Sequence, residues 1–445
     1  MRKIILTLFF LSSFLLGTDK DNILPYPIHQ TKLANDLNIV TIPFDSPGIV
    51  SFYIVVRVGA RDEVEKGVTG FAHFFEHMMF RGTDKYPKEK YSAVLKSIGA
   101  SANANTTQDR TLYVMTGDAT KLELMFELES DRFKNLNYSE HDFKTEAGAV
   151  KGEYTKNYAS PYQQIFEQLQ NTAFDKHTYK HTTMGFFDDI VDMPNQFEYS
   201  REFFKRYYRP EYCTVLVVGD AKREQVVKLS QQYFGDWERG SFVNSIPSEP
   251  QQTGTRFNHL QNGSIPPFLL LSYKGPAFNE DEIDMPTLDV LSSLTFSSTS
   301  KLYKKLVIEE QKIRFIGGGA LDSRDPNLFN IQVSLINKDD FQYVADEIFK
   351  TIEKLKDERV DEYTLDRTKS NLKYSYAMGI DSPTSIANSI SHYIQITGDP
   401  ETVNKVYSQY DKVTVDDIKK IAKKYFTKNG LTISTISADE LGGVK

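Results

Sequence analysis

The segment from Gly70 to Thr83 carries the residues with the clearest chemical meaning. It reads GFAHFFEHMMFRGT, and its lack of proline and of strand-like alternation predicts a helix. On a helix, His73 and His77 project from one face a turn apart, with Glu76 beside them. Two imidazoles at this spacing can chelate one metal ion, and the order H-x-x-E-H is the pattern called inverzincin. The pattern indicates zinc-dependent hydrolysis with Glu76 as general base.

A hydrolytic zinc site needs a third protein ligand and one open position for water. Downstream, the segment SEHDFKTEAGAVKGEYTKN opens with Ser139 and Asp142 spaced as a capping box, which predicts the start of a helix. On this helix Glu146 and Glu153 are two turns apart and face the same way. Either glutamate could complete the site, and the spacing alone does not choose between them.

A second histidine pair, His177 and His181, serves as an internal comparison. These histidines are also four residues apart, but Thr178, Tyr179 and Lys180 stand between them. No carboxylate accompanies the pair, and the ammonium of Lys180 would repel a cation. We therefore predict that this pair lies in a loop or at the surface.

The elements that must position these residues recur along the chain. The strand FYIVVRVGA begins at Phe52, and FLLLSYKGPA begins 216 residues later at Phe268. Tyr113 in TLYVMTGD and Phe329 in LFNIQVSL are also 216 residues apart. A third pair of segments, RYYRPEYCTVLVVGD and KYFTKNGLTISTISAD, ends the two halves. The repeated spacing predicts an internal duplication.

Between these strands, apolar residues return every three or four positions, as in LELMFELESDRFKNL and FQYVADEIFKTIEKLKDE, which predicts helices. The sequence thus predicts an α+β fold of two duplicated α/β domains, each a mainly antiparallel sheet with helices on one side. A stretch rich in proline, serine and glutamine at 245–255 predicts a linker. The predicted domains are 24–244, which bears the metal, and 256–445, which does not.

A run of three glycines lies at 317–319 in the second half. Glycine tolerates positive φ and marks bulges and tight turns in strands. We therefore predict a bulge or a tight turn there.

Composition and the N-terminus limit the partners and the place of action. The net charge is −7 with both signs scattered, so no basic stripe indicates nucleic-acid binding. Arg2 and Lys3 precede an apolar run, and residues 1–18 have the layout of a secretory signal peptide, with a retained anchor as the alternative. We expect an exported, periplasmic or secreted protein with no transmembrane span beyond the signal.

The metal motifs resemble those of the pitrilysin/insulinase family of zinc metallopeptidases, which includes mitochondrial processing peptidase. In that family a glutamate far downstream of the H-x-x-E-H helix is the third ligand, and Glu153 stands at that interval, 76 residues after His77. The resemblance implies one Zn²⁺ per chain, held by His73, His77 and Glu153. Glu146 matches the family's second glutamate, which supports a metal ligand rather than binding the metal.

The segment GASANANTTQDRTLY is similar to the family's strand G-G-x-x-N-A-x-T-x-x-D-x-T-x-Y, with Ala100 where a second glycine is usual. In the family this edge strand lies beside the metal and pairs with the backbone of an extended peptide. The resemblance therefore implies a zinc endopeptidase that acts on peptides or unfolded polypeptide segments. It also implies that Asn103 and Ala104 bind the substrate.

The second half departs from the family pattern. Family members that act alone, and partner subunits without metal, carry an arginine and a tyrosine that stabilise the oxyanion. Here Val307 and Arg314 stand near those positions in LYKKLVIEEQKIRFIGG. We therefore expect the catalytic subunit of a heterodimer whose partner supplies the arginine and tyrosine, with a homodimer as the alternative. A catalytically silent scaffold or assembly subunit with the same fold is the alternative function.

Overall fold

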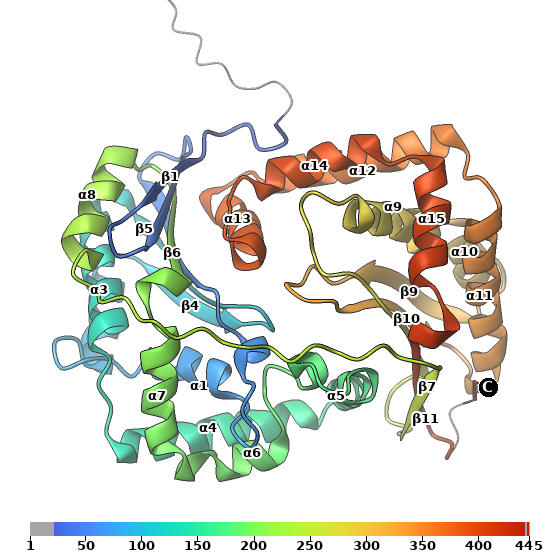
Figure 1. The fold of residues 1–445 in the computed structure, drawn as a ribbon, viewed down its shortest axis with the longest axis horizontal. Coiled ribbons are helices and arrows are strands. Elements are labelled where there is room, and N and C mark those ends of the chain that lie inside the picture. The colour runs from blue at the N-terminus through green and yellow to red at the C-terminus, as the bar shows by residue number, and fades with distance from the viewer. Residues whose placement is uncertain (1–21, 441–442, 445) are drawn as a thin grey trace, which may run out of the picture.

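The computed structural model describes residues 22–440 and 443–444 of the chain, and each half of the chain builds one sheet with its helices (Figure 1). The predicted signal peptide at 1–18 lies outside the described residues. Within the described part of the chain, no helix is both long enough and apolar enough to cross a lipid bilayer.

The first sheet has six strands in the order β1-β2-β6-β3-β5-β4. Strands β2 and β6 are parallel, and the other neighbours are antiparallel. Strand β4 is therefore an edge strand that pairs only with β5 in this sheet. The strands are β1 (His29–Lys32), β2 (Asn38–Pro43), β3 (Ile49–Val56), β4 (Ser101–Thr106), β5 (Thr111–Asp118) and β6 (Cys213–Gly219).

The second sheet repeats this plan in the order β7-β11-β8-β10-β9. Strands β7 and β11 are parallel and the remaining pairs are antiparallel. Each strand of the second sheet therefore has a counterpart in the first sheet, where β1 is the additional strand. The predicted α+β fold with two similar sheet-and-helix units is confirmed. The strands are β7 (Arg256–Gln261), β8 (Phe268–Lys274), β9 (Ile313–Ala320), β10 (Leu328–Leu335) and β11 (Leu431–Ser437).

Helices of the same half cover one face of each sheet (Figure 1). The helices of the first half are α1 (Phe71–Met78), α2 (Lys88–Ser97), α3 (Leu122–Asn135), α4 (Glu140–Tyr158), α5 (Pro161–Ala173), α6 (Phe187–Asp192), α7 (Phe197–Tyr207) and α8 (Arg223–Phe234). The helices of the second half are α9 (Asp284–Phe296), α10 (Lys301–Tyr303), α11 (Phe341–Asp357), α12 (Glu362–Gly379), α13 (Pro383–Thr397), α14 (Thr402–Lys412) and α15 (Val415–Tyr425).

One helix of each half packs against the sheet of the other half. Helix α5 lies on β7 and β11, and α13 lies on β3 and β6. Figure 1 shows α13 between the two sheets. The hydroxyl of Tyr53 on β3 donates a hydrogen bond to Asn388 Oδ1 on α13 at 3.0 Å. Both faces of the central strands are therefore buried, which explains why these strands are nearly continuous apolar runs.

Residues 237–255 form neither helix nor strand, and the predicted linker at 245–255 lies within this stretch. The linker is nevertheless anchored, because Glu249 accepts hydrogen bonds from the backbone amides of Asp175, Lys176 and His177 at 2.8 to 3.1 Å. The segment thus follows a defined path across the first half.

The glycines at 317–319 are regular residues of β9. Gly317 and Gly318 pair in register with Gln332 and Ile331 on β10, and none of the three glycines has positive φ. A Cβ atom on Gly318 would lie 2.5 Å from Cδ2 of Phe296. The predicted bulge or turn is therefore wrong, because glycine is needed here to make room for an aromatic ring.

Candidate metal centre

The predicted helix over the H-x-x-E-H motif is α1, and its apolar face explains its placement. Phe71, Phe74, Phe75 and Met78 recur at helical spacing and are fully buried. Ala72, the two histidines and Glu76 occupy the remaining positions of this helix. Burial of the phenylalanines and the methionine therefore turns the chemically active side chains away from the aromatic core.

A buried carboxylate from earlier in the chain binds the N-terminus of α1. Glu63 accepts hydrogen bonds from the backbone amides of Gly70 and Ala72, both at 2.7 Å. This contact satisfies amides that have no partner within the helix. Burial raises the pKa of Glu63 to about 8, against the opposing effect of the two amide donors.

Helix α4 begins with the predicted capping box. Ser139 Oγ accepts from the amide of Asp142 at 3.1 Å, and Asp142 Oδ2 accepts from the amide of Ser139 at 3.3 Å. The helix then brings both Glu146 and Glu153 to α1. The structure assigns them different neighbours, which the spacing did not distinguish.

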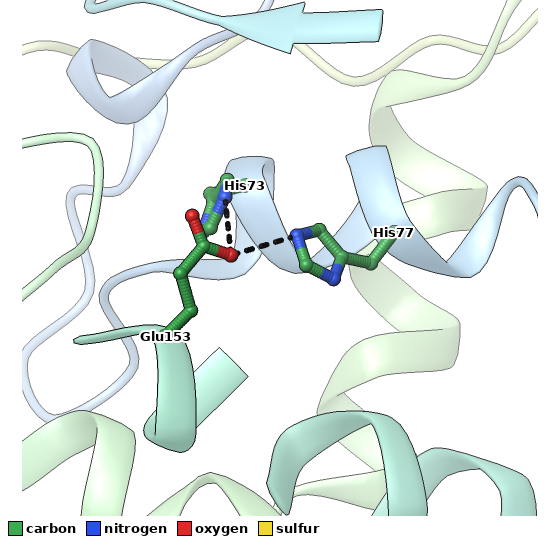
Figure 2. A group of neighbouring side chains, drawn as sticks. All are labelled: His73, His77 and Glu153. Carbon is green, nitrogen blue, oxygen red and sulfur yellow. Dashed lines mark ion pairs between the residues drawn. The ribbon is translucent and has the colours of Figure 1, made fainter. Parts of the chain in front are cut away.

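Figure 2 shows His73, His77 and Glu153 converging on one point. Glu153 Oε2 lies 3.2 Å from Nε2 of His77 and 3.8 Å from Nε2 of His73. One ligand atom from each of the three residues lies within 4.8 Å of the other two. The chemistry and number of these donors fit a zinc ion with one position left open.

The two histidines have different surroundings. Burial and the neighbouring His77 lower the pKa of His73 to about 4, which favours the neutral imidazole that binds metals. Nδ1 of His77 lies 2.9 Å from Glu146 Oε1, and this hydrogen bond raises the pKa of His77. The carboxylate of Glu146 favours the neutral tautomer of His77 that carries its proton on Nδ1. In this tautomer Nε2 has a free lone pair that faces the candidate metal position.

Glu146 is held on its other side by Arg81, which donates to Oε2. Burial alone would raise the pKa of Glu146, but the hydrogen bonds from His77 and Arg81 lower it overall. The carboxylate therefore acts on His77 as a charged acceptor. Arg81, four residues after His77, carried no signal in the sequence that linked it to the site.

Glu76 lies outside the group formed by His73, His77 and Glu153 and faces the edge strand β4. Its Oε2 accepts a hydrogen bond from Thr106 Oγ1, the last residue of β4, at 2.6 Å. Burial raises the pKa of Glu76. On the same strand Asn103 is exposed and Ala104 is buried. The free edge of β4 thus runs beside Glu76, and Thr106 joins the strand to this carboxylate.

His177 and His181 flank the short 3-10 turn Thr178–Lys180, as a loop position predicts, but both are buried. Nε2 of His177 lies 3.0 Å from Asp325 Oδ2 in the second half, and Nε2 of His181 lies 3.9 Å from Glu63 Oε2. The predicted surface position is wrong because the partners come from distant parts of the chain.

Sequence models of one peptidase family match both halves of the chain. Residues 43–185 match Insulinase (Peptidase family M16), and residues 196–372 match the Peptidase M16 inactive domain. Together the two matches span more than half of the chain. The chain belongs to peptidase family M16.

Relatives within the M16 family align over nearly the whole chain. The chain is 26% identical over 416 residues to the zinc protease PqqE of Helicobacter pylori, covering 90% of each chain. It is 22% identical to the mitochondrial-processing peptidase subunit beta of Saccharomyces cerevisiae, covering 87% of this chain and 86% of the relative. The crystal structure of a protease from Helicobacter pylori superposes with a TM-score of 0.84 at 26% identity, over 93% of this chain and 99% of that chain.

The segment that departs from the M16 pattern lies at the end of α10 and in β9. Residues Lys304–Glu309 form a turn of π-helix, in which Val307 packs against the core of the second half. Arg314 is exposed on the edge strand β9. Neither side chain belongs to the group around His73, His77 and Glu153.

Proposed function

We propose that the protein is a zinc-dependent endopeptidase that hydrolyses peptides or unfolded polypeptide segments. The observation that carries the proposal is the convergence of His73, His77 and Glu153, with Glu76 held between this group and a free strand edge. One Zn²⁺ per chain would occupy the centre of the three donors. Membership of the M16 family and the zinc protease names of its relatives support the same activity.

The residues of the chain then have separate roles. A bound zinc would polarise the scissile carbonyl and lower the pKa of water. Glu76 accepts the proton of the attacking water and passes it to the leaving amine. Glu146 orients His77 through its hydrogen bond. Asn103 and Ala104 on β4 bind the substrate as an added strand.

We further propose that the chain is the catalytic subunit of a heterodimer in an exported, periplasmic or secreted location. Val307 and Arg314 replace the arginine and tyrosine expected for the oxyanion, and a relative bears the name subunit beta. A partner of the same fold would supply the missing pair, and a homodimer is the alternative arrangement. The proposed domain limits are 24–244 and 256–445, joined by 245–255.

The Glu153→Gln variant is expected to lose most of its zinc, whereas wild type carries about one zinc per chain. Glu146→Gln should retain zinc with affinity reduced about 10- to 100-fold, because it removes only the charged acceptor of His77. Elemental analysis and titration with a chelator measure both effects. Glu89→Gln, an exposed change on α2, is the matched control.

Two outcomes would contradict these assignments. Zinc loss in Glu146→Gln with full retention in Glu153→Gln would exchange the two roles. A wild-type chain without zinc would favour the scaffold function.

The isolated chain is expected to hydrolyse peptides weakly, and a second family subunit carrying the arginine and tyrosine should raise kcat about 100-fold. A fluorogenic peptide assay, with the oligomeric state measured by light scattering, tests this expectation. A partner in which the arginine is replaced by alanine is the control. Robust turnover by a pure monomer would rule out the need for a partner.

A further inference from the structure

Arg110 precedes β5 at the turn that follows β4, and its side chain is only partly exposed there. Its Nη1 donates to Asn105 Oδ1 at 2.7 Å, whereas Nε is buried without a hydrogen-bond partner. Among residues 22–440 and 443–444, no carboxylate forms an ion pair with this side chain, although the charge of Glu76 acts on it from a longer distance. Asn105 itself is exposed, so the pair of side chains is open to a ligand.

An unpaired cation in a partly buried position is energetically costly. Burial lowers the pKa of Arg110 to about 10, in agreement with this environment. By contrast, Arg61 in the neighbouring part of the first half forms an ion pair with Asp325 at 2.5 Å. Arg57, which is also partly buried, donates instead to the backbone carbonyls of Gln395 and Ile396. Among the described residues the guanidinium of Arg110 donates only to Asn105, which indicates a ligand that supplies a further acceptor.

The alternation of side chains along the strands places Arg110 on one face of the first sheet. Arg110 alternates in step with Leu112 and Val114, which pack in the core shared with the second half. Tyr53, an electrostatic neighbour of Arg110, contacts α13 from the same face. Arg110 thus lies on the face of the sheet that is turned towards the second half.

Glu76 is reached from the opposite face of β4. Thr106, which binds Glu76, alternates with Asn105, which binds Arg110. An extended peptide added at the edge of β4 would present successive side chains to these two faces in turn. Every second side chain of the peptide would therefore pass the pair formed by Asn105 and Arg110.

We propose that Arg110 and Asn105 form a subsite that binds a carboxylate of the peptide substrate, which gives the enzyme a preference for an acidic residue near the scissile bond. The proposal rests on the peptidase function proposed above. A guanidinium binds a carboxylate with two parallel hydrogen bonds, and its two Nη groups are donors suited to this geometry. Because Asn105 Oδ1 already accepts from Arg110, the amide group of Asn105 remains available as a further donor.

The test measures peptide binding to the zinc-loaded full chain carrying Glu76→Gln, so that no turnover is needed. Fluorescence anisotropy compares amidated peptides in which one glutamate is moved through successive positions with peptides that carry glutamine instead. At one or more alternate positions, the glutamate peptide should bind on the order of tenfold more tightly. Adding Arg110→Met should abolish this preference, Arg110→Lys should retain part of it, and the exposed change Arg201→Met should leave it intact.

A glutamine peptide with a free C-terminus distinguishes a terminal carboxylate from a side-chain carboxylate, since only a terminal subsite would favour it over the amidated form. Equal affinities of the glutamate, glutamine and free-C-terminus peptides, including no measurable binding of any of them, would overturn the proposal. So would a preference that survives Arg110→Met. An Arg110-dependent binding preference in a chain whose wild type shows no turnover, alone or with its partner, would count against the peptidase function and leave the subsite standing.

Discussion

The Glu76→Gln variant should keep its zinc and lose peptide turnover by about 10²- to 10⁴-fold in kcat. The side chain lies outside the group of His73, His77 and Glu153, which is proposed to hold the zinc, so the amide of the variant should not disturb the ion. Glutamine has nearly the same shape and can still accept the hydrogen bond that Thr106 donates at 2.6 Å. It cannot take up a proton from water, and the loss should therefore fall on kcat with little change in KM.

The measurement pairs steady-state kinetics with zinc analysis on the same preparation, in the presence of the partner subunit where one is required. Glu89→Gln should behave as wild type. Thr106→Val removes the hydroxyl that orients Glu76 and should lower kcat by about tenfold, because the base is then misplaced rather than absent. Wild-type kcat in Glu76→Gln would remove this residue from the mechanism, and loss of zinc would indicate that it is a ligand.

Much of the metal centre could be predicted because its signals are local. The positions of His73, Glu76 and His77 follow from helical periodicity, and the capping box at Ser139 marks the start of α4. Helical spacing alone does not decide which of Glu146 and Glu153 is the third ligand, because both lie on the face of α4 that is turned towards α1. The structure separates them because Glu146 contacts Nδ1 of His77 and Glu153 faces Nε2.

The parts that sequence reasoning missed depend on contacts between distant segments. Glu63 at the N-terminus of α1 carries no capping signature, because it lies outside the usual capping positions. The burial of His177 depends on Asp325 in the other half of the chain. The same limit applies to α5 and α13, since an amphipathic pattern predicts a buried face without indicating which sheet covers it.

Removal of the cation of Arg132 should lower the free energy of unfolding by about 3–5 kcal/mol. Arg132 and Glu129 on α3 are almost completely buried, and Arg132 Nε donates to Glu129 Oε2 at 2.9 Å. The guanidinium also lies 4.8 Å from the ring centroids of both Phe80 and Tyr113. In Arg132→Met the apolar side chain of methionine takes the place of the arginine stem. The carboxylate of Glu129 then stays buried and, among the described residues, keeps only the hydroxyl of Tyr91 as a side-chain donor.

The cause of this loss can be separated from loss of packing by a second variant. In Arg132→Met with Glu129→Leu no charge is left unpaired, so the double variant should recover much of the stability lost by the single change. Urea denaturation of both variants in the same chelator-containing buffer measures the difference. Equal destabilisation of the two variants would show that the rings of Phe80 and Tyr113, rather than the charge of Glu129, require the arginine. Phe80 follows α1, and Tyr113 lies on β5, the strand that pairs with β4. Either result would therefore show whether charge or packing at Arg132 supports the two elements that carry the site.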